Sequence, residues 1–323
     1  MQEETYLTSG CTLLNLMVSG SPDKAYIFGK IHNIFGVEGS GKSYLSLLAC
    51  KNAFEQFQDD SYIVYDDSER ALNMNFVELT FPELFEASDK VDDSSNVVLL
   101  HSKTIEDFFE NLNQLAERKQ SYKVYVLDSY DALWSKDSKE DGYQTEKVRK
   151  FSFLAGKIFN LCYEANILLI LINQIRQDIG GVIKTYRTTG GFIGRHAPSL
   201  RLQLHPSEKF TKKGHGTDIV FMQKFDFQVI KSRFGKPFRR GSYYLNFYNG
   251  KIDNELTNIM YLVATGKISK DKKTKKLTYD EKHFSPLELA RYIRQNNKQE
   301  EILKMLLETF EAEEKRLQSL CDF

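Results

Sequence analysis

The stretch that most constrains the fold of this chain is Gly36-Val37-Glu38-Gly39-Ser40-Gly41-Lys42-Ser43. The apolar run Ile31–Phe35 precedes it, and apolar residues at helical spacing follow it from Tyr44 onward. A strand, a glycine-rich loop and a helix in this order are the context in which the pattern G-x-x-x-x-G-K-[ST] binds phosphate. Inward-facing backbone N–H groups and the positive end of the helix dipole together attract anions. The stretch therefore predicts a nucleotide-binding α/β fold rather than a glycine-rich surface turn.

The side chains of this loop predict contacts to a nucleotide and its metal ion. Lys42 is expected to reach the β- and γ-phosphates, Ser43 to bind Mg²⁺, and Tyr44 to lie beside the nucleotide. Hydrolysis also requires a carboxylate that holds the Mg²⁺ shell. Asp128 ends the apolar strand Tyr122–Asp128 and is the candidate. A strand-end acid that caps the following turn is the alternative.

Two further polar groups follow predicted strands at the same edge of the sheet. Glu69 comes after the strand Ser61–Tyr65 and is a candidate for orienting the attacking water. On spacing alone, an exposed acidic cluster that includes Asp66 and Asp67 explains it equally well. Gln174 follows the apolar run Ile167–Ile172, at the carboxyl edge where α/β sheets bind ligands. Gln174 could therefore sense the γ-phosphate by hydrogen bonding.

Charge is distributed unevenly along the chain, although 44 Lys and Arg balance 44 Asp and Glu. From Arg176 to Arg240 there are 14 Lys and Arg against 4 Asp and Glu. Within this block, Gly180-Gly181 is followed by Lys184, Tyr186 and Arg187, which combine phosphate neutralisation with an aromatic ring. Single-stranded DNA requires that combination. Taken alone, the segment is more typical of a solvated surface loop.

The order of apolar runs predicts the architecture. Strands alternate with helices as far as residue 172, which indicates a mainly parallel, twisted sheet. From Ser199 onward, β-rich runs without intervening helices predict an antiparallel extension. A lysine-rich stretch after Gly266 and a helical tail from Pro286 to Leu320 predict a small C-terminal α+β domain. The expected organisation is a short N-terminal segment (1–30), a core (31–265) and a C-terminal domain (266–323).

The ordered motifs resemble the RecA family of DNA strand-exchange ATPases, in particular its bacterial and bacteriophage recombinases. The resemblance extends from about Leu7 to about residue 310. It is carried by Gly36–Ser43, Asp67–Leu72, Val126–Ser129, Ile172–Arg176 with Ile179-Gly180, Thr188–Gly191, Ser199–Leu202, and Val229–Arg233 with Pro237-Phe238. It implies a RecA-like ATPase core that uses ATP and Mg²⁺.

Several roles are implied by the resemblance alone. Glu69 matches the family's catalytic glutamate, and Gln174 matches the glutamine that links the γ-phosphate to DNA affinity. Phe76 matches an aromatic that stacks on adenine, whereas Asn73 stands where the family has an acid at the base edge. Lys231 and Arg233 match a basic pair that reaches the ATP of the next subunit. Before this match, a solvated strand face was the simpler explanation of that pair.

The resemblance also implies DNA-binding segments at residues 135–145 and 176–187, with Ile179 wedging between bases. The expected DNA-binding residues are Arg176, Ile179, Gly180, Gly181, Lys184, Tyr186, Arg187, Thr188, Thr189, Gly190 and Gly191. Partners would be single-stranded and duplex DNA and further copies of the chain in a helical filament, with ATP at the subunit interface. The C-terminal domain would help to gather duplex DNA. Only seven residues precede Thr8, where bacterial members carry a docking arm.

The leading hypothesis is thus an ATP-dependent recombinase that forms filaments on single-stranded DNA and exchanges strands. Two alternatives stay open: a RecA-like remodeller or helicase-type motor, and a non-catalytic paralogue that binds DNA or filaments. The four cysteines are far apart and form no C-x-x-C pair, which is typical of a reducing cytosol. The resemblance implies the cytoplasm of a bacterium or of a phage-infected cell. The sequence shows no signal peptide or membrane-spanning run.

Overall fold

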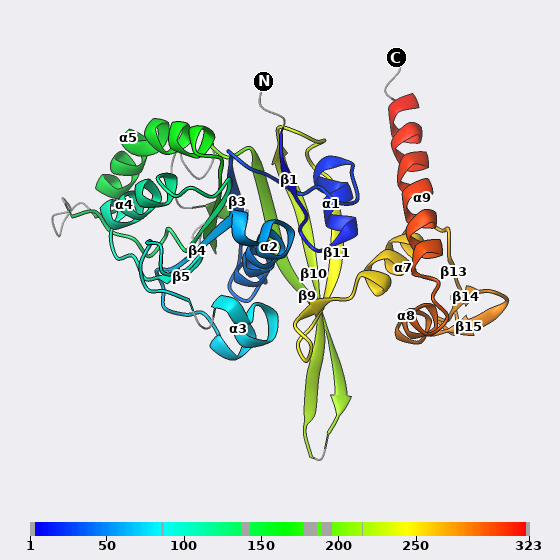
Figure 1. The fold of residues 1–323 in the computed structure, drawn as a ribbon. Helices are drawn as coiled ribbons and strands as arrows, with labels where there is room; N and C mark the ends of the chain where they lie inside the picture. The colour runs from blue at the N-terminus through cyan, green and yellow to red at the C-terminus, as the bar shows by residue number, and fades with distance from the viewer. Residues whose placement is uncertain are drawn as a thin grey trace.

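The computed structural model describes residues 4–84, 87–136, 143–177, 186–188, 196–214 and 216–320. Within these ranges a ten-stranded sheet forms the centre of the molecule, in the order β12-β11-β10-β9-β3-β7-β6-β4-β5, with β8 paired to β7 (Figure 1). The expected mainly parallel sheet with an antiparallel extension is confirmed.

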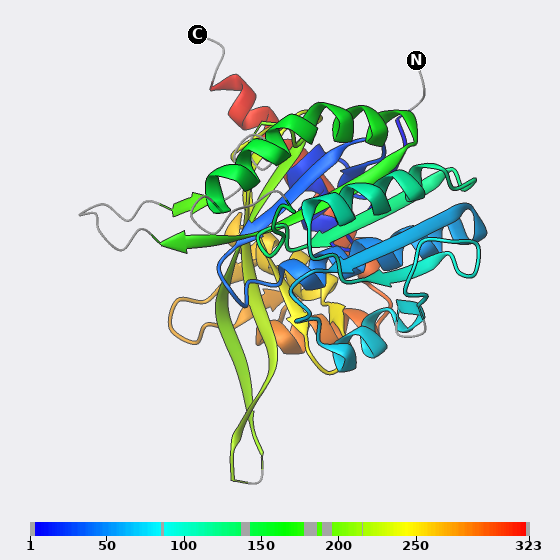
Figure 2. The same cartoon turned by 90° about the vertical axis from the view of Figure 1, so that its left-hand side faces the viewer.

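The parallel part of the sheet separates two hydrophobic cores. Its strands are β3 (Ile31–Gly36), β7 (Ile167–Gln177), β6 (Tyr122–Asp128), β4 (Ser61–Asp67) and β5 (Val97–Leu100). Successive side chains of β6 point to opposite faces, so that Val124 and Val126 join one core while Tyr125 and Leu127 join the other. Helix α2 (Lys42–Phe57) covers the first face, and α4 (Ile105–Ala116) and α5 (Tyr143–Glu164) cover the second (Figure 2).

The antiparallel extension begins at β9, which pairs in parallel with β3 and antiparallel with β10. It consists of β9 (Leu200–Lys213), β10 (Asp218–Ser232), β11 (Arg240–Asn246) and β12 (Lys251–Ile252). The far end of the β9–β10 hairpin projects away from the rest of the molecule (Figures 1 and 2). Strand β9 is longer than the expected run Ser199–Leu204, because its polar second half finds backbone partners on β10.

The N-terminal segment packs against the sheet. Strands β1 (Tyr6–Leu7) and β2 (Tyr26–Ile27) form a small antiparallel pair. Helix α1 (Thr12–Ser19) buries its leucines in the first core and ends at Gly20, which adopts the left-handed conformation. The remaining short elements of this half are η1 (Gln58–Asp60), α3 (Met74–Thr80), η2 (Pro82–Leu84) and β8 (Tyr186–Thr188).

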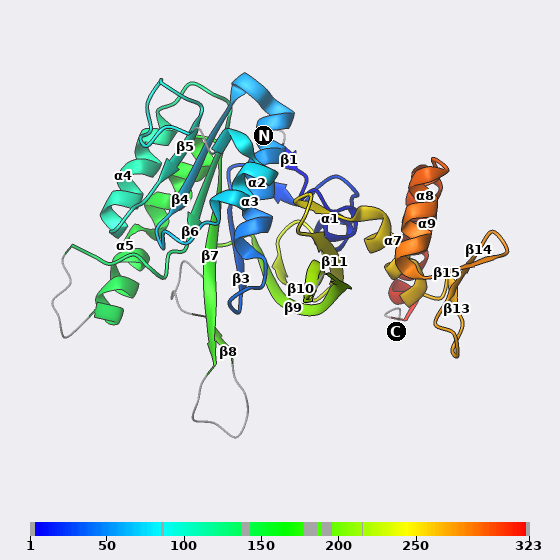
Figure 3. The ribbon, with the colours of Figure 1, turned by 90° about the horizontal axis from the view of Figure 1, so that it is seen from below.

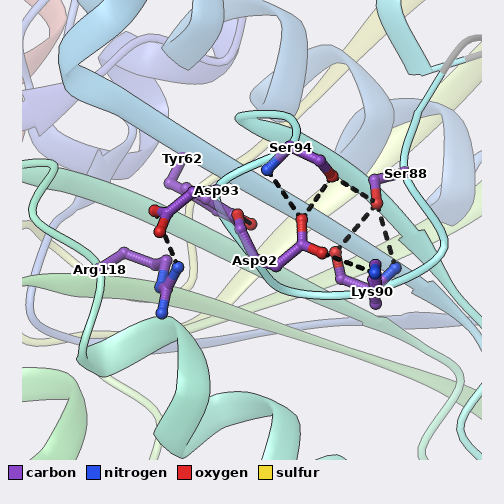
Figure 4. Close-up of polar contacts among 7 residues, drawn as sticks. All are labelled: Tyr62, Ser88, Lys90, Asp92, Asp93, Ser94 and Arg118. Carbon is purple, nitrogen blue, oxygen red and sulfur yellow. Dashed lines mark hydrogen bonds and ion pairs between the residues drawn. The ribbon is translucent and has the colours of Figure 1, made fainter.

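Polar contacts organise the chain ahead of the edge strand β5 (Figure 4). Ser88 forms a parallel bridge with Val98, so the edge is partly covered by the chain itself. Asp92 accepts a hydrogen bond from the backbone N–H of Ser94 at 2.8 Å, and its carbonyl accepts one from the Tyr62 hydroxyl at 2.7 Å. Arg118 forms an ion pair with the neighbouring Asp93 at 3.0 Å. The exposed pair adds little stability, so the loop rests mainly on the hydrogen bonds.

The C-terminal part has a third hydrophobic core. It is built from α7 (Asn254–Ala264), the small sheet β13 (Ser269–Lys270), β14 (Leu277–Tyr279) and β15 (Lys282–Phe284), and α8 (Pro286–Gln295). The expected helical tail consists of two helices, α8 and α9 (Gln299–Ser319). Asn297 interrupts the helix between them, because its φ of 53° is left-handed. The expected small α+β addition is confirmed; its exact boundary near residue 265 stays a prediction.

Helix α9 contacts both the third core and the first. Ile302 is buried in the third core, whereas Leu306 and Phe310 are buried in the first. Near the end of α9, Glu314 pairs with Lys236 at 2.6 Å and with Arg239 at 2.5 Å. Arg239 also donates to the carbonyl of α1 residue Leu16 at 3.2 Å. The turn between β10 and β11 is therefore attached to α9 and α1.

No helix in the described ranges combines the length and apolar character needed to cross a membrane.

Candidate nucleotide site and DNA interface

The phosphate loop lies between the end of β3 and the start of α2. A Cβ atom at Gly36 would lie 2.2 Å from the carbonyl oxygen of Leu204 on β9, so only glycine allows this close approach of two strands. Gly41 caps α2 with φ of 81°, a left-handed conformation that also favours glycine. The loop thus turns directly into the helix N-terminus, where backbone N–H groups point outward from the helix end.

Lys42 is buried beneath the loop that it terminates, with 8% of its surface exposed. Its ammonium donates to the carbonyl oxygens of Gly36 at 3.2 Å and Val37 at 2.8 Å. Burial lowers the pKa of Lys42, and the negative charges of Asp128, Glu69, Asp131 and Glu38 oppose that shift. The Lys42 ammonium is therefore held among carboxylates at the end of the sheet, where its positive charge could also balance that of a polyphosphate.

Asp128 lies beside the phosphate loop at the end of β6. Its carboxylate accepts a hydrogen bond from the Tyr65 hydroxyl at 2.7 Å. Burial raises the pKa of Asp128 to about 6, although the hydroxyls of Ser43 and Tyr65 act in the opposite direction. Ser43 lies close enough to influence the Asp128 carboxylate, so the two side chains expected to bind Mg²⁺ are near each other. A divalent cation there would compensate the buried charge.

Glu69 follows the end of β4 and Gln174 lies on β7, and the two side chains come together although β6 separates these strands in the sheet. The Gln174 amide nitrogen lies 3.4 Å and 3.3 Å from the two carboxylate oxygens of Glu69. The Ser129 hydroxyl donates a short hydrogen bond to the same carboxylate. A glutamate held by an amide and a hydroxyl has a defined orientation, which a group that positions water requires.

The other two acids of the cluster have structural partners. Asp66 is fully buried and accepts hydrogen bonds from the Ser102 N–H at 2.8 Å and the Tyr125 hydroxyl at 2.6 Å. Asp67 accepts from the backbone N–H groups of Ala71 at 3.1 Å and Leu72 at 3.0 Å. The acidic cluster is therefore not simply a solvated surface: two acids support the local chain, and Glu69 contacts Gln174.

Phe76 and Asn73, expected near the base, lie together with Tyr44, which was expected beside the nucleotide. The ring centroids of Tyr44 and Phe76 are 5.2 Å apart in an edge-to-face arrangement. Asn73 caps α3, and its side chain accepts a hydrogen bond from the Phe76 N–H at 3.3 Å. The Tyr44 hydroxyl donates to the Gly250 carbonyl at 3.1 Å. Asn73 thereby fixes the start of the helix that presents Phe76, a structural task that its sequence match did not anticipate.

Lys231 and Arg233 lie away from the phosphate loop of their own chain. Strand register places Lys231 opposite Arg201 and Arg201 level with Asn33, three positions before Gly36. That separation corresponds to about 10 Å along the strands and about 10 Å across them. Both side chains donate to the His196 carbonyl, at 2.8 Å and 3.4 Å. Burial lowers the pKa of Lys231, and the charges of Arg233 and Arg201 add to that effect.

The expected DNA-binding residues are only partly within the described ranges. Strand β8 pairs antiparallel with the end of β7, and Arg176 lies opposite Arg187 and Gln177 opposite Tyr186 (Figure 3). Thr188 is the last residue of β8. Ile179, Gly180, Gly181, Lys184, Thr189, Gly190 and Gly191 lie outside the described residues, as do residues 137–142 of the other expected segment.

Three site residues were not expected from the sequence. Tyr65 and Ser129 hydrogen-bond the carboxylates of Asp128 and Glu69, and Asp131 accepts a hydrogen bond from the Gln174 N–H at 2.8 Å. Tyr65 reads as one more core aromatic in an apolar strand. Ser129 and Asp131 follow the strand end of Asp128 closely, and this position was the available signal.

The raised pKa of Asp128 predicts that ionisation of this carboxyl group lowers the stability of the folded, ligand-free protein. Because the folded chain holds this proton more tightly than the unfolded chain, stability should fall as pH rises from about 4 to about 6. The cost above that range is about 3 kcal/mol at most, since Asp128 keeps some accessible surface. Asp128→Asn should therefore unfold at a higher temperature than wild type near pH 7, and at the same temperature below pH 4. A stabilisation equal at both pH values would contradict the charge as its cause.

Fold and site together define a class: an α/β protein of the phosphate-loop type, with its candidate nucleotide site at the carboxyl ends of parallel strands. Residues 4–252 match the family model described as the RecA N-terminal domain. The chain therefore belongs to the RecA family.

Relatives named "Protein RecA" share a modest fraction of their residues with this chain. The protein from Mesoplasma florum is 25% identical over 220 residues, which is 67% of this chain and 61% of the relative. A plasmid-encoded protein from Lactococcus lactis is 24% identical over 251 residues, which is 76% of this chain and 67% of the relative. The protein from Francisella tularensis subsp. novicida is 28% identical over 244 residues, which is 72% of this chain and 62% of the relative. The chain thus spans about two thirds or slightly less of these relatives.

Proposed function

We propose that this chain is a DNA-dependent ATPase that assembles on single-stranded DNA and promotes homologous pairing and strand exchange. The observation that supports this most directly is the contact between Glu69 and Gln174. It joins the candidate water-orienting acid to the strand β7, which continues into the pairing with β8 and the basic segment. A change at the γ-phosphate and a change at DNA would therefore act on the same residue, Gln174.

The residues around the phosphate loop fit ATP with Mg²⁺. The backbone of Gly36–Ser43 would hold the phosphates, and Lys42 would balance the charge of the β- and γ-phosphates. Ser43 and Asp128 would bind the Mg²⁺, which neutralises charge on the transferring phosphoryl group when present. Glu69 would orient the attacking water, while Phe76 would stack on the base.

The remaining parts of the proposal concern partners. Lys231 and Arg233 would contact ATP bound to an adjacent copy, because they lie too far from their own phosphate loop to do so. The proposed assembly is a helical filament on DNA in the cytoplasm of a bacterium or phage-infected cell. Arg176, Tyr186, Arg187 and Thr188 would contribute to the DNA interface together with the neighbouring residues of the basic block.

Stimulation of ATP turnover by single-stranded DNA tests the coupling. We expect wild type to be stimulated about tenfold, a common size for coupling between two ligands. Gln174→Ala should lose the stimulation, because the side chain that contacts Glu69 is gone. Gln114→Ala, on the distant helix α4, is a matched control and should be stimulated normally. Equal stimulation in all three proteins would refute the role of Gln174.

Strand exchange between a circular single strand and a homologous linear duplex then separates the candidate activities. A recombinase produces joint molecules that depend on ATP and on homology. DNA-stimulated turnover without joint molecules would instead favour the remodeller or motor.

A further inference from the structure

Gln174 is hydrogen-bonded at both its side chain and its main chain. Its side-chain amide contacts Glu69, as described above, and its backbone N–H donates to the Asp131 carboxylate at 2.8 Å. The carboxylate therefore fixes the point about which the Gln174 side chain turns. A hydrogen bond to a charged acceptor is stronger than a neutral one, so this restraint is substantial.

Asp131 is itself held in place by its surroundings. Its carbonyl oxygen accepts a hydrogen bond from the Lys147 ammonium of α5 at 2.7 Å. Lys147 is only 5% exposed, and its ammonium lies 5.8 Å from the ring centroid of the buried Tyr130. The Tyr130 N–H in turn donates to the Ile172 carbonyl of β7 at 3.3 Å. The segment after β6 is thus bonded to both α5 and β7.

The bonded residues stand at the borders of both segments expected to bind DNA. Asp131 precedes the 135–145 segment, and Lys147 follows it closely. Gln174 lies two residues before Arg176, where the other segment begins. One aspartate therefore connects the borders of two DNA-binding segments to the residue that contacts Glu69.

We propose that Asp131 is a positioning residue that couples DNA binding to ATP turnover by fixing the main chain of Gln174. This inference rests on the proposed function. In it, DNA bound at either segment acts on Gln174 through a fixed support, so that its side chain transmits the change to Glu69. Without the Asp131 carboxylate, the Gln174 backbone N–H loses this hydrogen bond and the main chain there is less restrained. The effect of DNA on Glu69 then weakens.

A different role for Asp131 can be distinguished by experiment. Its negative charge also acts on Lys42, so Asp131 could influence turnover purely as a charge. Asp131→Asn removes the charge but keeps an oxygen that can accept the Gln174 N–H. Asp131→Ala removes both. The positional role predicts that the asparagine variant resembles wild type and that the alanine variant does not.

The experiment measures ATP turnover with and without single-stranded DNA in wild type, Asp131→Ala and Asp131→Asn. We expect the ratio of stimulated to basal turnover to fall about tenfold in Asp131→Ala, as for the loss of one charge-assisted hydrogen bond. Asp131→Asn should keep most of the wild-type ratio, because its oxygen still accepts the Gln174 N–H as a weaker, neutral acceptor. Thermal unfolding of each variant shows whether it is folded. If Asp131→Ala does not fold, Asp131→Asn alone decides.

Two outcomes would overturn the inference: normal stimulation in a folded Asp131→Ala, or a loss of stimulation in a folded Asp131→Asn that equals the loss in Asp131→Ala. The second would assign the effect to charge. A failure of the proposed function looks different, because wild type itself would then show no stimulation by DNA. A purely structural defect lowers both turnover rates without changing their ratio, so the ratio separates such a defect from a loss of coupling. The concentration of DNA that gives half-maximal stimulation supplies a second readout.

Discussion

Lys42→Ala is expected to lower ATP turnover by about a hundredfold or more, the loss usual for one preorganised group that stabilises transition-state charge. The effect is large because the Lys42 ammonium is buried at the loop, where the field of a cation is poorly screened. Turnover in the presence of Mg²⁺ and saturating single-stranded DNA is the measurement.

Lys51→Ala is the matched control for that variant. Lys51 lies on the same helix and forms an ion pair with Glu55 at 3.6 Å. Losing such a partly exposed pair costs little, so turnover should stay close to wild type. Wild-type turnover in Lys42→Ala would rule out Gly36–Ser43 as the site of hydrolysis.

The double variant Lys231→Ala, Arg233→Ala is expected to lose about a thousandfold in turnover, as when an arginine supplied by a neighbour is removed. Nucleotide binding to the isolated protomer should be nearly unchanged, since both residues lie far from their own phosphate loop. Equilibrium binding of a fluorescent ATP analogue and turnover on DNA provide the two measurements. Lys209→Ala with Lys213→Ala, at exposed positions of the β9–β10 hairpin, is the control of equal charge.

Mixing two inactive variants tests the shared site directly. Lys42→Ala keeps the basic pair, and the double variant keeps the phosphate loop. If the site is shared between copies, random assembly of equal amounts makes about one interface in four complete, and turnover returns to about a quarter of wild type. If each chain holds a whole site, the mixture stays inactive and the filament proposal fails.

The fold could be read from the sequence where local patterns determine it. The glycine-rich loop between an apolar strand and a helix specified β3 and α2, and Thr104 with Asp107 forms the capping box that begins α4. The runs 61–65, 97–100 and 122–128 correspond to β4, β5 and β6. In each case, apolar residues bounded by polar or turn residues left few alternatives.

The contacts between strand ends could not be read in the same way. Asp131 and Gln174 are far apart in the sequence, and only the order of β6 and β7 in the sheet makes them neighbours. Spacing alone did not distinguish Glu69 from Asp66 and Asp67, because strand-end acids look alike before their partners are known. Tyr65 had no polar signature, since its hydroxyl finds Asp128 from inside an apolar strand.

The attachment of α9 has a consequence for how the molecule can be divided. Leu306 and Phe310 complete the first core, and Glu314 pairs with the turn that follows Lys231 and Arg233. A protein cut ahead of α9 would lose more than a peripheral module, because the cut would uncover apolar surface of the first core and release that turn. Residues distant from the phosphate loop in sequence therefore contribute to the rigidity of the surface that we propose meets the next copy.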